Sequence, residues 1–324
     1  MTAVALLTAA AVTVMLGVDT AGAQSSAGRL VTRSYSNAAG TRAYEVYVPG
    51  NYRAGTAAPL IVALHGCTET ADQFRQLSRY DEVADSSGAI VVYPEQTKDA
   101  NYLGCWNFFQ DAHNHRGSGE PSLIAGITNA VRHQYNIDAH HIYVTGLSAG
   151  GAMASVMGAT YPDLYAAVGV GSGCEYAAGA ACAGYQSADP TQAAQKIHQE
   201  MGPRARVMPF IIFQGDQDKT VPPVNADQMV KADLLADDMA DDGANNGSIS
   251  QWPSKTSFGQ APGGRSYTVR HYTDRNGRPI GEYWTIHGMA HAWSGGPASI
   301  PFSDSAGPNE SAAMYSFFAK QSAP

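Results

Sequence analysis

The sequence is poor in charged residues. Lys, Arg, Asp and Glu make up 15% of its 324 residues and hydrophobic residues 44%, which is typical of a globular protein rather than a disordered or coiled-coil one. Acidic side chains outnumber basic ones, and the formal net charge is −8. A nucleic-acid-binding groove needs the opposite sign, so we expect no nucleic acid partner. The charge is compatible with a neutral or polymeric substrate but selects none.

Long apolar runs are missing beyond the N-terminus, so no later segment is expected to cross a membrane. Residues 3–18 form an almost uninterrupted apolar run, and small residues ending at Ala23 follow it. This order is typical of a secretory signal peptide. The alternative, a membrane anchor, needs about 20 apolar residues to span a bilayer. We predict a signal peptide over residues 1–23, and a secreted protein without stable membrane association.

Cysteine is scarce, and no Cys-x-x-Cys spacing occurs. An even number of cysteines in an exported chain favours disulfides, and four cysteines allow three pairings. Cys174 and Cys182 lie close together in a Gly/Ala-rich loop and are predicted to pair, which leaves Cys67 with Cys105. The alternative, a metal site, is disfavoured because the cysteines do not cluster with histidines. The His-containing tract 111–115 is expected to be solvated surface, and we predict no metal.

Internal repeats and Pro/Ser-rich linkers are also missing. Short apolar runs alternate instead with longer helical patterns, which predicts a mostly parallel sheet with helices on both faces. The predicted strands are 44–48, 59–65, 89–93, 141–146, 166–170, 207–213, 267–272 and 282–287. The predicted helices are 71–84, 122–134, 149–161, 225–239 and 311–319.

The same pattern predicts the domain organisation. Residues 24–324 are expected to form one α/β catalytic domain, with no separate lid or substrate-binding domain. The segment 242–264 is rich in Gly, Asn and Ser, and we expect it to be a long surface excursion.

The chemistry begins at the only Gly-x-Ser-x-Gly segment, Gly146-Leu147-Ser148-Ala149-Gly150. It follows a predicted strand and precedes a predicted helix, which is the context of the nucleophile elbow in α/β-hydrolases. Small neighbours let strand and helix approach each other around a strained serine. The alternative, an ordinary Gly-rich turn, is common for the bare motif but not in this context. We predict Ser148 as the nucleophile, with the amide of Ala149 facing the oxyanion.

A serine nucleophile needs a base, and in this fold the order along the chain is Ser, acid, His. Three histidines come late enough. His271 lies within a predicted strand and His287 ends another, whereas His291 lies in the loop just beyond. We predict His291 as the base and a structural role for His287.

Two aspartates follow the strand 207–213 and compete for the role of the acid. Asp216 comes first and could instead shape the turn through its side chain. Asp218 stands further along, where its carboxylate can reach His291 and hold the imidazole tautomer.

The second oxyanion donor is expected in the loop after the strand 59–65, where Gly66 precedes Cys67. The amide of Cys67 would point inward, and a bond to Cys105 would fix this loop and place Trp106 beside the site. Trp106 and Trp293 are candidates for lining the acyl or alcohol pocket. Core packing is an equally common role for such aromatics.

Five segments together resemble the poly(3-hydroxybutyrate) depolymerase family of esterases, relatives of feruloyl and acetylxylan esterases. They are His65-Gly66-Cys67, Cys105-Trp106, the Ser148 motif, 215–221 and 287–296, and the resemblance covers roughly residues 44–318. It implies an α/β-hydrolase fold and the triad Ser148, Asp218 and His291, with Asp218 preferred over Asp216. It also implies hydrolysis of short-chain hydroxyalkanoate esters through an acyl-enzyme, with no metal or organic cofactor.

Two other functions remain as alternatives. A carbohydrate esterase of the feruloyl or acetylxylan type would share every catalytic residue. A non-enzymatic binding module is disfavoured because all three triad residues are present. Extracellular depolymerases of this type usually carry a linker and a binding domain, and this sequence shows neither before Pro324. Soluble oligomers and small esters are therefore expected substrates alongside the polymer.

Overall fold

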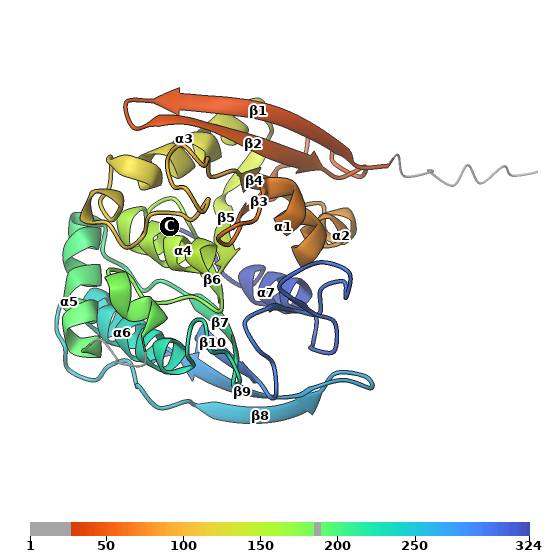
Figure 1. Cartoon of the computed structure of the whole chain (residues 1–324). Coiled ribbons are helices and arrows are strands. Elements are labelled where there is room, and N and C mark those ends of the chain that lie inside the picture. The colour runs from red at the N-terminus through yellow and green to blue at the C-terminus, as the bar shows by residue number, and fades with distance from the viewer. Residues whose placement is uncertain (1–26, 185–188) are drawn as a thin grey trace, which may run out of the picture.

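The computed structural model describes residues 27–184 and 189–324 and is built around a ten-stranded sheet (Figure 1). The strand order is β1-β2-β4-β3-β5-β6-β7-β10-β9-β8. The strands are β1 Arg29–Asn37, β2 Gly40–Val48, β3 Ala58–Leu64, β4 Ile90–Pro94, β5 Ile137–Leu147, β6 Ala167–Gly171, β7 Phe210–Gly215, β8 Lys255–Gln260, β9 Ser266–Thr273 and β10 Pro279–Ile286, with a small pair β11 Trp293–Ser294 and β12 Ser303–Asp304. The predicted signal peptide over 1–23 lies outside the described residues.

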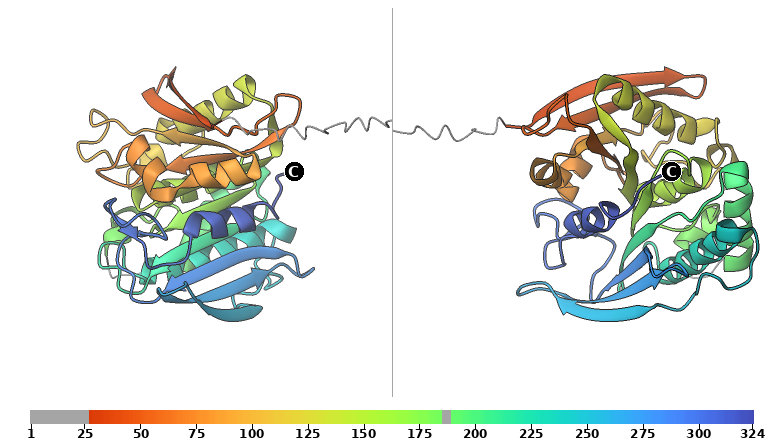
Figure 2. Two further views of the ribbon diagram at one scale, coloured as in Figure 1. Left: turned by 90° about the vertical axis from the view of Figure 1, so that its right-hand side faces the viewer. Right: turned by 180° about the vertical axis from the view of Figure 1, so that it is seen from behind.

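The centre of the sheet is parallel and its margins are antiparallel. β4, β3, β5, β6, β7 and β10 run parallel to one another, whereas β4 pairs antiparallel with β2 on its other side. The hairpins β1–β2 and β9–β10 and the outer strand β8 pair antiparallel. Figure 2 shows β1 and β8 at opposite ends of the sheet. β3, β4 and β6 are apolar throughout because helices cover both faces of the sheet there, which confirms the predicted α/β class.

Helices form two layers. One layer packs on the sheet face toward which the side chains of Leu60 and Val62 point. The other packs on the opposite face, toward which Ile61 and Ala63 point. The first contains α3 Gly119–Gln134, α4 Ala149–Thr160, α5 Pro190–Met201 and α6 Val224–Asp242; the second contains α1 Ala71–Ser78, α2 Tyr80–Ser87 and α7 Glu310–Phe318. This alternation along β3 follows from the two-residue period of a strand.

Two sequence-based expectations were wrong. The helix predicted over 71–84 is two helices, because Arg79 adopts a left-handed conformation with φ of 57° and both ends α1 and begins α2. The break lets Tyr80 enter the core against Trp293 while Arg79 pairs with Glu82. The expected surface excursion 242–264 contains β8, which pairs with β9.

The parallel strands end at one edge of the sheet, and the segments that carry the predicted site residues follow them there. β5 ends at the Ser148 turn, β7 ends before Asp216 and Asp218, and β10 ends one residue before His287. Since carboxyl ends of parallel strands meet at one edge, this edge is where a site can be assembled. No helix among residues 27–184 and 189–324 has the length and apolarity to cross a membrane.

Candidate active site

Ser148 occupies a strained turn between β5 and α4. Its φ of 57° and ψ of −120° are unusual for a residue with a side chain, and it is partly exposed. A Cβ at Gly150 would lie 2.1 Å from the carbonyl oxygen of Leu64, and one at Gly146 would lie 2.5 Å from the same atom. Only glycine fits at either position, so these two residues allow the tight turn that lifts Ser148 from the sheet.

His291 and Asp218 form a buried pair. Nδ1 of His291 lies 2.8 Å from Oδ2 of Asp218, whose side chain is fully buried. The other carboxylate oxygen accepts the N–H groups of Thr220 and Val221 at 2.8 and 2.9 Å. Burial raises the pKa of Asp218, but the hydrogen bond and charge of His291 and the two amides outweigh it and leave the pKa lowered. The ionised carboxylate therefore holds hydrogen on Nδ1 and leaves Nε2 as the basic nitrogen.

A second Asp–His pair lies beside the first. Nδ1 of His287 is 3.0 Å from Oδ2 of Asp216, and its Nε2 is 2.9 Å from the hydroxyl of Thr268. The other oxygen of Asp216 accepts the N–H of Gly288 at 2.7 Å. Both ring nitrogens of His287 are thus engaged. The pair joins the turn that carries Asp218 to the turn that carries His291.

The loop after β3 holds its peptides in a fixed orientation. His65 is fully buried, and its Nε2 accepts the N–H of Gln96 at 2.9 Å, so its Nδ1 carries hydrogen and donates to the carbonyl of Gly66 at 2.7 Å. Burial lowers the pKa of His65 to about 4, which keeps the ring neutral. In a trans peptide the N–H points away from the C=O. Anchoring the Gly66 carbonyl therefore turns the N–H of Cys67 away from His65.

Two further contacts fix the same loop. Cys67 is bonded to Cys105, and the N–H of Thr68, with φ of 66°, donates to the carbonyl of Leu103 at 2.8 Å. The second candidate donor, the N–H of Ala149, is the first of α4 and has no intrahelical acceptor. Both amides are therefore built into rigid backbone.

The second predicted disulfide, between Cys174 and Cys182, is also present. It packs against Ala152 in the first turn of α4 and against Val221, beside the amide that binds Asp218. One disulfide thus fixes the loop after β3, and the other packs against the first turn of α4 and the turn that carries Asp218.

Trp106 and Trp293 both lie in the core. Trp106 is fully buried beside the ring of His65, with its indole N–H unpartnered among the described residues. Trp293 packs edge-on against Phe74, and its indole N–H donates to the hydroxyl of Ser311 at 3.1 Å. Neither indole reaches solvent, so this structure gives no support for substrate contact by either. Each instead packs in the core next to a segment of the candidate site, Trp106 beside His65 and Trp293 two residues after His291.

Exposed apolar side chains do lie near the site, and they are not among the residues predicted from the sequence. The ring of Phe302 is 6.3 Å from that of His291 and its residue is 42% exposed. The carbonyl of Leu103 accepts the N–H of Thr68 in the loop after β3, here called the oxyanion loop (residues 65–69). Leu103 is 47% exposed, and Tyr102 beside it is 84% exposed. All three lie in loops without a motif, so no pattern in the sequence singles them out.

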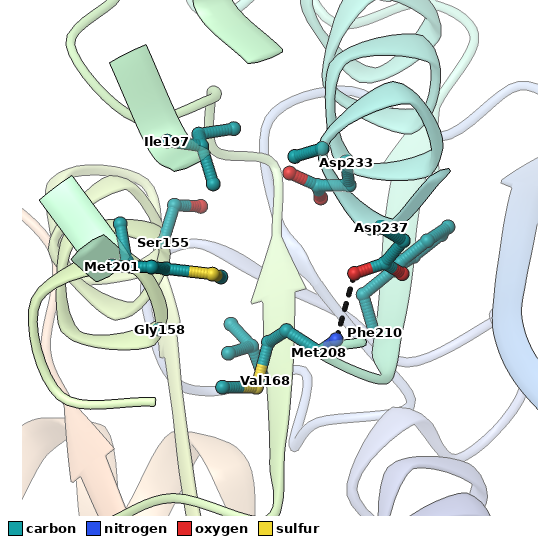
Figure 3. A pocket seen from close by; sticks show the side chains of 11 residues that line it. Ser155, Gly158, Val168, Ile197, Met201, Met208, Phe210, Asp233 and Asp237 are labelled. Atoms are coloured by element: carbon teal, nitrogen blue, oxygen red, sulfur yellow. Dashed lines mark hydrogen bonds between the residues drawn. The ribbon is translucent and has the colours of Figure 1, made fainter. Parts of the chain in front are cut away.

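The rest of the described structure was predicted to hold no metal and contains a small cavity. Among the described residues, no group of three or more potential ligands could hold a metal ion. In the tract 111–115, His115 pairs with Glu200 at 2.8 Å. A small cavity of about 30 Å³ lies between α4, α5 and α6, where the carboxylates of Asp233 and Asp237 face the thioether of Met201 (Figure 3).

Comparisons with known proteins identify the family. A family model described as esterase PHB depolymerase matches residues 42–248. The chain is 32% identical over 245 residues to poly(3-hydroxyalkanoate) depolymerase C of Paucimonas lemoignei, covering 72% of this chain and 55% of that one. It is 36% identical over 213 residues to a probable acetylxylan esterase A of Neosartorya fischeri, covering 60% and 55%. The chain thus spans about half the length of these relatives.

Solved structures are similar in fold. An acetyl xylan esterase from Aspergillus awamori superposes with a TM-score of 0.66 at 25% identity, covering 82% of this chain and 94% of that one. A feruloyl esterase module from Clostridium thermocellum has a TM-score of 0.54 at 16% identity and shares the fold.

Proposed function

The chain belongs to the PHB depolymerase family of esterases, and from that membership we propose that it is a secreted serine hydrolase of short-chain hydroxyalkanoate esters. The observation that carries the proposal is the strained Ser148 turn at the same sheet edge as the buried His291–Asp218 pair. A weak nucleophile beside an oriented base is the arrangement that acyl transfer needs.

The proposed mechanism has two halves. Nε2 of His291 takes the proton of the Ser148 hydroxyl, whose oxygen attacks the ester carbonyl carbon, while the amides of Cys67 and Ala149 bind the oxyanion. His291 then protonates the leaving alcohol, and an acyl-enzyme remains. In the second half His291 takes a proton from water, whose oxygen attacks the acyl carbon, and then gives that proton to the oxygen of Ser148 as its bond to the acyl carbon breaks and the acid leaves. Asp218 holds the imidazole and balances its charge. No metal or organic cofactor enters either half.

The surface around the triad favours an apolar acyl chain. Phe302 and Leu103 expose apolar area beside the base and the oxyanion loop. A methyl-bearing hydroxybutyrate unit would cover such area without leaving polar groups unpaired. Similarity to the Paucimonas lemoignei depolymerase supports the same substrate class.

A second candidate function is removal of acetyl groups from xylan. It is favoured by the superposition on the acetyl xylan esterase from Aspergillus awamori and by the acetylxylan esterase relatives. The triad would act identically on both substrates, since only the groups on either side of the ester differ.

A substrate panel tests the proposal. We expect purified protein to release acid from hydroxybutyrate oligomers faster than from acetylated xylan or methyl ferulate. Ser148→Ala should abolish every activity, whereas Ser155→Ala, a control on the same helix, should leave them intact. Equal activity in Ser148→Ala would refute the mechanism. Preference for acetylated xylan or ferulate would replace the substrate class.

Export is part of the proposal. Two disulfides support secretion, because such bonds form and persist in oxidising compartments outside the cytosol. Expression with residues 1–23 should deliver protein to the medium with Gln24 at its N-terminus, measured by N-terminal sequencing. Retention of the intact leader on cellular protein would contradict it.

A further inference from the structure

Glu69 is a buried carboxyl group that the mechanism above does not use. It stands in the oxyanion loop two residues after Cys67 and is only 8% exposed. Its Oε2 accepts the N–H of Gly66 at 2.6 Å. A Cβ at Gly66 would lie 3.0 Å from this oxygen and 3.5 Å from Cβ of Ser148, so the carboxyl group lies next to the nucleophile turn.

The bond to Gly66 completes the control of the loop. His65 anchors the Gly66 carbonyl, and Glu69 anchors the Gly66 N–H, so the peptides on both sides of Gly66 are held. Glycine would otherwise let this segment rotate freely. With both groups bound, the N–H of Cys67 is left as the amide of this segment that faces the site.

Glu69 also interacts with the base. Burial raises the pKa of Glu69 to about 7, against the opposing effects of the Gly66 N–H and the charge of His291. The carboxyl group therefore gains and loses its proton in the same pH range in which a histidine base works. A negative Glu69 stabilises the imidazolium form of His291, since opposite charges in a buried setting attract strongly.

The other charged groups around the loop are engaged elsewhere. His65 is neutral, as described above. Asp72, in α1, pairs within its own helix, and Glu95, just after β4, accepts the first amide of α1 at 3.4 Å. Asp218 lies behind the base and is bonded to it. Among the described residues, His291 is thus the charged partner through which ionisation of Glu69 would be felt.

We propose that Glu69 is a positioning residue of the oxyanion loop, and that its ionisation also shifts the acid limb of the rate profile through His291. The proposal rests on the proposed ester hydrolysis. Two functions of one side chain can be separated, because glutamine keeps an oxygen to accept the Gly66 N–H but carries no charge, whereas alanine keeps neither.

The experiment measures kcat and KM for a soluble ester between pH 5 and 9 for wild type, Glu69→Gln and Glu69→Ala. Glu69→Ala should lose about 10- to 100-fold in kcat at every pH with little change in KM, because a misplaced oxyanion donor weakens the transition state alone. Glu69→Gln should keep the plateau kcat within about threefold, with its acid limb about 0.5 pH unit lower.

Asp237→Asn is the matched control. Asp237 is also buried and accepts one backbone amide, that of Met208 at 2.7 Å, but it lies at the opposite edge of the sheet. The Asp237→Asn variant should leave the acid limb of the rate profile at the same pH as in wild type. An unshifted acid limb in Glu69→Gln would overturn the electrostatic part, and a full plateau kcat in folded Glu69→Ala would overturn the positioning part. If wild type itself shows no activity that depends on Ser148, the proposed function fails instead.

Discussion

The two Asp–His pairs provide a direct test of which aspartate supports the base. The carboxylate of Asp218 accepts four hydrogen bonds and donates none. His291 and Gln214 donate to one oxygen, and the N–H groups of Thr220 and Val221 donate to the other. In Asp218→Asn, the new NH2 group must face a donor on either side. Facing the backbone would leave two amides unpaired, each costing about 1–3 kcal/mol, so it will face His291.

That orientation reverses the imidazole. Nδ1 must then accept, hydrogen moves to Nε2, and the base loses its free nitrogen. We expect kcat to fall by about 10³- to 10⁴-fold, equivalent to about 4–5.5 kcal/mol of transition-state stabilisation. KM should change little, because the tautomer matters in the chemical step.

Asp216→Asn is the control for this change. Its NH2 group would face His287, whose Nε2 would then carry hydrogen and donate to Thr268. A hydroxyl both donates and accepts, so this network survives the reversal. We expect kcat within about tenfold of wild type.

The assay is p-nitrophenyl butyrate hydrolysis near pH 8, with folding of each variant checked by circular dichroism. A folded Asp218→Asn variant that stayed within tenfold of wild type would refute the role of Asp218 in holding the tautomer of His291. A loss of about 10³-fold or more in Asp216→Asn alone would reassign the acid to Asp216.

Three further outcomes are expected. Gly150→Ala should destabilise the protein by about 3 kcal/mol or prevent soluble expression, because its Cβ would overlap the Leu64 carbonyl; a normal thermal midpoint would contradict this. Replacing Cys67 and Cys105 with serine should lower both the free energy of unfolding, by about 3–4 kcal/mol, and kcat, measured by denaturant titration and ester hydrolysis; unchanged kcat would count against the tether. Burial raises the pKa of Asp233 to about 8, so the native state keeps a proton that the unfolded chain releases near pH 4, and stability falls as pH rises between these values. Asp233→Asn should therefore raise the thermal midpoint more at pH 8 than at pH 5, and a pH-independent difference would refute it.

Much of the fold and the candidate triad could be predicted from the sequence because those features depend on short stretches of neighbouring residues. Buried parallel strands are continuous apolar runs, and the Ser148 turn requires glycines at fixed positions. The break at Arg79 is different, since it follows from the burial of Tyr80 against a helix more than 200 residues later. An edge strand such as β1, exposed along most of its length, needs no apolar run either.

The choice of acid and base shows most clearly what the sequence alone does not determine. Two aspartates stand two residues apart and two histidines four residues apart, so the sequence permits either assignment. In the structure each aspartate bonds one histidine, and burial separates the pairs: Asp218 is fully buried, whereas Asp216 is 32% exposed. The supporting contacts of His65 and Glu69 have no local pattern, because they depend on how one loop folds back on itself.

The contacts between the two turns also limit how this site can change over evolution. The N–H of Gln217 donates to the carbonyl of Met289 at 3.0 Å, and Asp216 binds both His287 and the next amide. An insertion in one turn would therefore displace the other, and lengths of both must vary together. New specificity is more readily acquired by exchange of the exposed side chains of Leu103 and Phe302, which leaves the backbone contacts of Asp218 and His291 unchanged.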